Sequence, residues 1–191
     1  MLMRRLALLL CLLAPLACPA RDTVLRPGNV AIVINEADAN SREIGDYLRE
    51  ARQIPRRNVV KVSIPDSPHT LSAEQFDALK RSIDAQLHPD TEVVVLVWTA
   101  PYAVECNSIT SALTLGFDAG QCTNTCAPGK PSRYFDSRVQ RPYAELGMRL
   151  SMLLPTTDVK LARALIDRGR LPWFAASEAN AHRHLIVAMA G

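Results

Sequence analysis

Cys106 and His69 are two side chains that could supply the nucleophile and the base of a cysteine hydrolase. Cys106 follows the third predicted strand, and His69 lies in the loop after the second predicted strand. A cysteine attacks as a thiolate, and a neighbouring imidazole can remove the thiol proton. Loops that follow adjacent strands of a parallel sheet meet at one edge, so the sequence predicts a Cys106/His69 dyad as one candidate site. A disulfide at Cys106 would remove this nucleophile.

The cysteines predict a disulfide rather than a metal site. Beyond the apolar start of the chain, the cysteines are Cys106, Cys122 and Cys126. In an oxidising compartment we expect one disulfide between two of them, with the third thiol free or paired outside the chain; Cys122 and Cys126 could close a small ring. A zinc site needs about four ligands. No histidine lies between Pro89 and Ala181, so we expect no bound metal.

Polar side chains near the ends of predicted strands form a second candidate site, which would bind a ligand. Asn35 ends the first strand, and Ser41 and Arg42 follow it, where a helix amino end and a guanidinium could bind an anion. Thr99 and Tyr102 follow the third strand and could face a substrate. The alternative is that these residues have structural roles. Ser41 would then cap a helix and Arg42 would be a solvated charge. The segment from Thr99 to Tyr102 would be a turn with a half-buried tyrosine.

Strands and helices alternate along the first half of the chain. Apolar runs rich in β-branched residues predict buried strands at residues 30–34, 59–64 and 92–98. Helical spacing predicts one helix that is capped by Asn40 or Ser41, and a second in which Ser72 and Gln75 fit a capping box. Right-handed crossovers then give a three-layer α/β fold with a parallel central sheet and flanking helices, flavodoxin-like or caspase-like.

No nucleotide cofactor is expected at the first turn of this fold. The turn at residues 35–41 contains no glycine. Both the dinucleotide fingerprint and the phosphate-binding loop need glycines there, because the backbone must approach the phosphates closely. We therefore expect the protein to work without such a cofactor.

The second half of the chain is less regular. After Asn107 a long loop contains the cysteines, and loops of this length are usually functional. Helices are predicted at residues 142–154 and again at 158–167, the latter capped by Thr157, which makes the C-terminal part helical. The apolar run at residues 185–191 would either pack as a last element or mark a chain that is cut short.

Residues 1–20 have the pattern of a secretory signal peptide, which leaves residues 21–191 as a single α/β domain. Arg4 and Arg5 precede an apolar run at residues 6–16, and small residues follow. A membrane-spanning helix needs about 20 apolar residues, so we expect no membrane span once the leader is removed. Cys18 suggests a lipid anchor, but Pro15 stands where a lipoprotein signal has an aliphatic residue. The expected location is the periplasm or the outside of the cell.

Composition and charge exclude several classes of protein. The chain has 191 residues, of which 48% are hydrophobic and 21% charged, so disorder and collagen-like repeats are excluded. The formal net charge is +3, and loss of the two leader arginines reduces it to +1. We therefore expect no nucleic-acid partner.

Short segments along residues 29–170 resemble a bacterial family of exported proteins whose function is uncharacterised. They match its opening and its middle section in order and spacing. The segments are residues 29–35, 41–44, 47, 52–55, 58–59, 108–115, 134–135, 149–152 and 162–168. The resemblance implies an exported α/β protein longer than this chain, and it supplies no catalytic residues. The cysteine-bearing stretch from Cys106 to Cys126 departs from the family, where this region varies.

Two functions follow from these patterns. The favoured one is an exported ligand-binding or assembly module for an unidentified ligand or protein, because no complete set of nucleophile, base and orienting group is present in the sequence. The alternative is a caspase- or gingipain-like cysteine hydrolase that uses Cys106 with His69.

Overall fold

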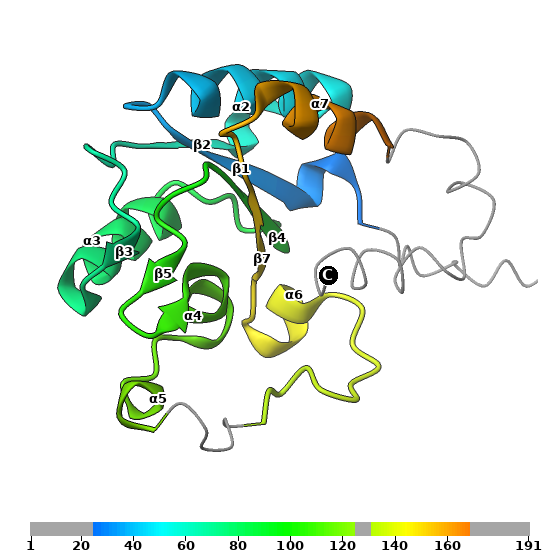
Figure 1. Cartoon of the computed structure of the whole chain (residues 1–191). Helices are drawn as coiled ribbons and strands as arrows, with labels where there is room; N and C mark the ends of the chain where they lie inside the picture. The colour runs from blue at the N-terminus through cyan, green and yellow to red at the C-terminus, as the bar shows by residue number, and fades with distance from the viewer. Residues whose placement is uncertain (1–24, 125–130, 169–191) are drawn as a thin grey trace, which may run out of the picture.

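A computed structural model of the chain describes residues 25–124 and 131–168. Its centre is a parallel sheet in the order β2-β1-β4-β7 (Figure 1). The strands are β1 (Val30–Asn35), β2 (Val59–Val62), β4 (Val93–Val97) and β7 (Leu150–Leu154). The predicted parallel α/β architecture is confirmed.

The two faces of the sheet are buried by alternating residues of the same strands. In β1, Ile32 and Ile34 contact one core cluster while Val33 contacts the other. In β4, Val95 and Leu96 divide in the same way. A strand that is covered on both faces must be apolar at every position, which is why these strands could be recognised as continuous runs of valine, isoleucine and leucine.

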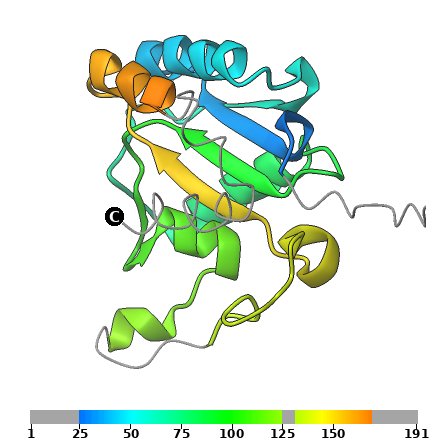
Figure 2. The same cartoon turned by 90° about the vertical axis from the view of Figure 1, so that its right-hand side faces the viewer.

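Helices cover both faces and complete three layers (Figures 1 and 2). On one face, α2 (Ala39–Ala51) and α7 (Val159–Arg168) lie side by side and contribute residues to the same core cluster. On the other face, α3 (Ala73–Asp84) and α4 (Ile109–Leu115) pack with Trp98 in the second cluster. The described residues also form the short helical elements η2 (Pro27–Asn29), η3 (Arg56–Asn58), α5 (Gly120–Thr123) and α6 (Pro142–Leu146).

A second, smaller sheet flanks the α3/α4 side. It has the order β3-β5-β6, with β3 (Thr70–Leu71) parallel to β5 (Ala103–Val104) and β5 antiparallel to β6 (Asn107–Ser108). The segments that follow β2 and β4 therefore meet in this small sheet.

Helix starts agree with the sequence in one case and differ in two. Ser72 and Gln75 form the predicted capping box of α3. The predicted cap of α2 was wrong, because Asp38 accepts the hydrogen bond from Asn40 N, and Ser41 lies buried within the helix. At α7, Asp158 Oδ1 accepts from Leu161 N, 2.9 Å away, in place of the predicted cap Thr157.

The helix predicted over residues 142–154 is wrong in its second half. α6 ends at Leu146, and Gly147 follows in the left-handed conformation with φ of 67°. Residues 150–154 then pair with β4 along its whole length, Val93 opposite Leu150 and Val97 opposite Leu154. Leucine and methionine favour helices in isolation, but pairing with the central strand overrides this local preference.

Several sequence predictions lie outside the described residues. They concern the leader at 1–20, Cys126, and the apolar run at 185–191. Within residues 25–124 and 131–168, no helix has the length and apolar character needed to cross a bilayer.

Gly45 leaves room for Ile34 where α2 crosses β1. A Cβ at position 45 would lie 2.5 Å from Ile34 Cδ1 and 2.6 Å from Cγ1. Alanine gains about 1 kcal/mol in helix propensity, but overpacking a core contact costs about 1–3 kcal/mol. We expect Gly45→Ala to lower the free energy of unfolding, measured by urea denaturation, by about 1 kcal/mol. In an Ile34→Ala background the same change should be neutral or stabilising; equal losses in both backgrounds would contradict this explanation.

Candidate functional site

The order of the strands creates a switch point between β1 and β4. The chain passes from β1 to β2 on one side, and then crosses to β4 on the other side of β1. In open parallel sheets, ligands bind beyond the carboxyl ends of the strands at such a switch. The residues around the ends of β1 and β4 therefore form the candidate site, and the sequence predicts ligand-binding residues at both ends.

Ser41 lies between the carboxyl ends of these two strands. It belongs to the first turn of α2 and is fully buried. Its hydroxyl accepts a hydrogen bond from Asn35 N at 2.9 Å and donates to the carbonyl oxygen of Val97. Ser41 thus ties the end of β1 to the end of β4.

Asn35 ties the end of β1 to the loop after β2. Its Oδ1 accepts from Ile64 N at 2.9 Å and from Ala37 N at 3.1 Å, while its Nδ2 donates to Ile64 O at 3.1 Å. The side chain is fully buried. Asn35 and Ser41 therefore build the edge, and their polar atoms are engaged by the protein itself.

Thr99 joins the end of β4 to the segment after β7. Its Oγ1 accepts from Thr156 N and Thr157 N, both at 2.9 Å, and from the Thr157 hydroxyl at 2.7 Å. Asn40 Nδ2 donates to Thr156 O at 3.0 Å and extends this connection to α2. The result is a continuous polar rim along the carboxyl ends of β1, β4 and β7.

A cluster of charged side chains lies at the β1–β2 half of the same edge. Arg42 is exposed and donates to the carbonyl oxygen of Glu36. The Glu36 carboxylate lies 2.8 Å from Lys61 Nζ, and its hydrogen bond and negative charge raise the pKa of Lys61. The prediction that Arg42 binds an anion beside the helix amino end stays a prediction.

His69 and Tyr102 form an exposed aromatic pair beyond the ends of β2 and β4. Their ring centroids are 5.5 Å apart with the planes tilted by 32°, and Tyr102 is 49% exposed. Their backbones are joined because Tyr102 N donates to His69 O at 3.0 Å. Within the described part of the chain, neither the imidazole nor the phenol hydroxyl has a hydrogen-bond partner. This pair therefore offers a ring face together with unsatisfied polar atoms.

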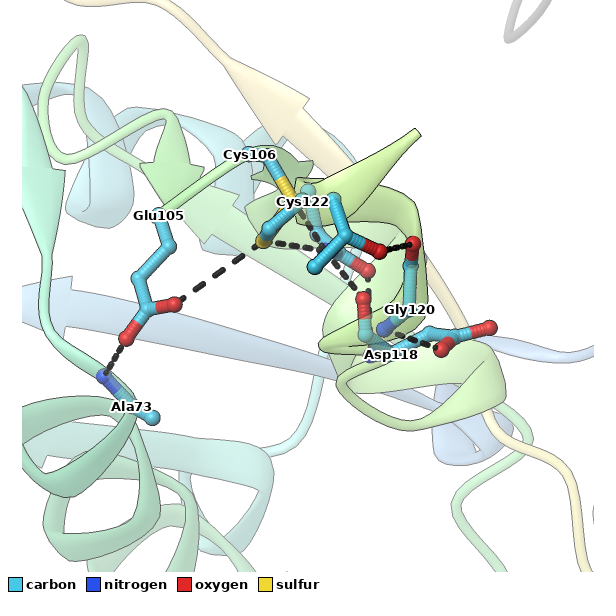
Figure 3. The surroundings of a disulfide bond; sticks show 8 residues. Ala73, Glu105, Cys106, Asp118, Gly120 and Cys122 are labelled. Carbon is cyan, nitrogen blue, oxygen red and sulfur yellow. Dashed lines mark hydrogen bonds between the residues drawn. A yellow bond between two sulfur atoms is a disulfide. The ribbon is translucent and has the colours of Figure 1, made fainter. Parts of the chain in front are cut away.

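Cys106 lies at the far end of the small sheet, in a disulfide with Cys122 (Figure 3). His69 precedes β3, whereas Cys106 follows β5, and these two strands run parallel. Because a strand rises about 3.3 Å per residue, the register separates His69 from the Cys106 turn by on the order of 10 Å. The structure does not bring the proposed nucleophile and base together.

Some residues of this edge were missed by sequence reasoning. Asp38 and Thr156 complete the rim, where the Thr156 hydroxyl lies 3.5 Å from Asp38 Oδ2. Thr156 and Thr157 follow β7, for which the sequence pattern predicts a helix, so that pattern does not place them at the edge. Asp38 carried a usable signal, because an aspartate at the start of a helix is a preferred cap.

Among residues 25–124 and 131–168, no cluster of three His, Cys, Asp or Glu side chains has the geometry to hold a metal ion.

Comparisons of the chain with protein-family models, with curated proteins and with solved structures found no significant match.

Proposed function

We propose that this chain is an exported binding module that holds a small, ring-bearing polar ligand at the carboxyl edge of its central sheet. The observation that carries the proposal is the exposed His69–Tyr102 pair beyond the strand ends. An aromatic face binds rings through apolar and π contacts, and the free phenol and imidazole can add hydrogen bonds. Small-molecule sites typically combine apolar surface with a few polar groups of this kind.

The polar rim next to this pair supports binding rather than nucleophilic chemistry. The loops of the edge are held in place by hydrogen bonds of Asn35, Ser41 and Thr99. A rigid edge of this kind preorganises the exposed groups, which lowers the entropy lost when a ligand binds. The sulfur of Cys106 is bonded to Cys122, so it carries no thiolate in the oxidised protein.

The proposed location is the periplasm or the outside of the cell. Residues 1–20 have the order of a secretory leader, with arginines before an apolar run and small residues after it. The Cys106–Cys122 disulfide is compatible with this location, because disulfides persist in oxidising compartments.

The proposal is tested on protein expressed with its leader in a bacterial host and recovered from the periplasmic fraction. Mass spectrometry should find a new amino terminus near Arg21. The purified protein is then screened by NMR with fragments that carry a sugar or heteroaromatic ring. We expect the amide shifts to cluster at His69, Tyr102 and Thr157, and Tyr102→Ala to weaken binding about tenfold, which corresponds to the loss of about 1.4 kcal/mol.

Phe135 provides the matched control, because it is an aromatic residue that is 82% exposed outside this edge. Phe135→Ala should leave the fragment affinities unchanged. Shifts that cluster away from the His69–Tyr102 pair, or equal losses in both variants, would contradict the proposed site. Labelling of Cys106 by a thiol-directed peptidase probe, abolished by His69→Ala, would instead favour the hydrolase.

A further inference from the structure

The two sulfurs of the disulfide have different neighbours. Cys106 lies in the turn between β5 and β6 and is exposed, while Cys122 lies in α5 and is half-buried, with 5.1 Å between the two Cα atoms. No residue of α5 is buried. The bond therefore attaches α5 to the hairpin where packing contributes little.

A hydrogen-bond donor lies close to Cys106. Asn107 Nδ2 is 3.1 Å from Cys106 Sγ and 4.0 Å from Cys122 Sγ. The amide is held in place by Asp118, whose O accepts from Nδ2 at 3.0 Å and whose N donates to Oδ1 at 3.1 Å. This donor is thus fixed and nearer to the Cys106 sulfur.

A carboxylate lies close to Cys122. Glu105 Oε2 is 3.8 Å from Cys122 Sγ, and Oε1 accepts a hydrogen bond from Ala73 N at 3.2 Å, at the start of α3 (Figure 3). Negative charge on a sulfur is stabilised by a hydrogen-bond donor and opposed by a neighbouring carboxylate. The surroundings therefore favour a thiolate at Cys106 over a thiolate at Cys122.

We propose that this disulfide is a thiol-exchange site with a fixed direction, at which a low-molecular-weight thiolate adds to Cys122. The incoming sulfur forms a bond to Cys122 Sγ, the Cys106–Cys122 bond breaks, and its electron pair leaves on Cys106 Sγ as a thiolate. One disulfide replaces another, so no further oxidant or reductant is needed. The direction follows because exchange is faster when the departing thiol has the lower pKa.

Glutathione is the probe for this proposal, applied to the mature chain with Cys126→Ser, which removes the third thiol. After short exposure near pH 8, free thiols are blocked with N-ethylmaleimide, and peptides are mapped by mass spectrometry. We expect glutathione on Cys122 and maleimide on Cys106, in at least about tenfold excess over the reverse pattern, which corresponds to a difference of about 1.4 kcal/mol between the activation free energies of the two directions of exchange.

Two controls test whether the preference comes from the folded surroundings of the disulfide rather than from the two cysteines themselves. Glu105→Gln keeps an oxygen that can accept from Ala73 N but removes the charge near Cys122, so the preference should fall several-fold while circular dichroism stays unchanged. The same protein unfolded in urea should show no preference. Equal adducts on both cysteines of the folded protein, an excess on Cys106, or no reaction under conditions that open an exposed model disulfide would overturn the proposal.

Discussion

Replacing Glu92 with alanine should lower the free energy of unfolding by about 2–4 kcal/mol, because a buried carboxylate with two charge-assisted hydrogen bonds is lost. Glu92 is 1% exposed at the amino end of β4, the edge opposite the candidate site. Its Oε1 accepts from Arg141 Nε at 3.1 Å, and its Oε2 accepts from Tyr143 N at 2.7 Å. The carboxylate therefore fastens the first turn of α6 to the sheet.

The expected cost comes mainly from the backbone of α6 and from the space left behind. Arg141 is 47% exposed at its side chain, so its guanidinium can turn to water when the carboxylate is removed. Tyr143 N, in contrast, loses its acceptor, and the volume of the lost side chain is left as a cavity. This is why the estimate stays below the about 3–5 kcal/mol seen when a fully buried ion pair loses one partner.

Two variants test this division. Glu92→Gln keeps the volume and an acceptor for Tyr143 N, so it should cost about half as much as Glu92→Ala. Arg141→Met removes the partly exposed partner alone. We expect it to cost no more than Glu92→Gln; a larger cost would mean that the ion pair dominates. Urea denaturation of the oxidised protein measures all three. A change below about 0.5 kcal/mol for Glu92→Ala, the level of an ordinary surface substitution, would contradict the structural role of this carboxylate.

The strands of the central sheet that could be predicted share one property, which the fourth strand of that sheet, β7, lacks. β1, β2 and β4 are rich in valine and isoleucine, and β-branched side chains favour the pleated conformation at each position. β7 reads Leu-Ser-Met-Leu-Leu, and these residues fit a helix equally well. Its conformation comes from pairing with Val93 and its neighbours in β4, more than fifty residues earlier in the chain, which a local pattern does not contain.

The same limit explains the candidate site. Asn35, Ser41, Thr99 and Tyr102 could be located because they adjoin predictable strands. Their roles depend on partners that are distant in sequence, such as the carbonyl of Val97, which accepts a hydrogen bond from the Ser41 hydroxyl. A helix cap and a serine that joins two strands look alike in sequence, and the tertiary contact decides between them.

Replacing Asn35 with alanine should cost about 2–4 kcal/mol of unfolding free energy, because the buried N–H and C=O of Ile64 and the N–H of Ala37 would lose their partners. The cost should be visible at the site itself. Ile64 begins the segment that leads to His69, so we expect faster hydrogen exchange at the Ile64 amide and a weaker fragment affinity at the His69–Tyr102 pair.

Asn58 is the matched control for this prediction, since it is also a buried asparagine that joins strand ends. Its Nδ2 donates to Gly28 O at 2.8 Å and Val30 O at 2.9 Å, at the opposite edge of the sheet. Asn58→Ala should destabilise the fold yet leave exchange at Ile64 and fragment affinity unchanged under native conditions. If both variants weaken fragment binding equally, the loss reflects global stability. Only a loss confined to Asn35→Ala assigns the positioning of His69 to this one side chain, and so connects the end of β1 to the ligand-binding surface.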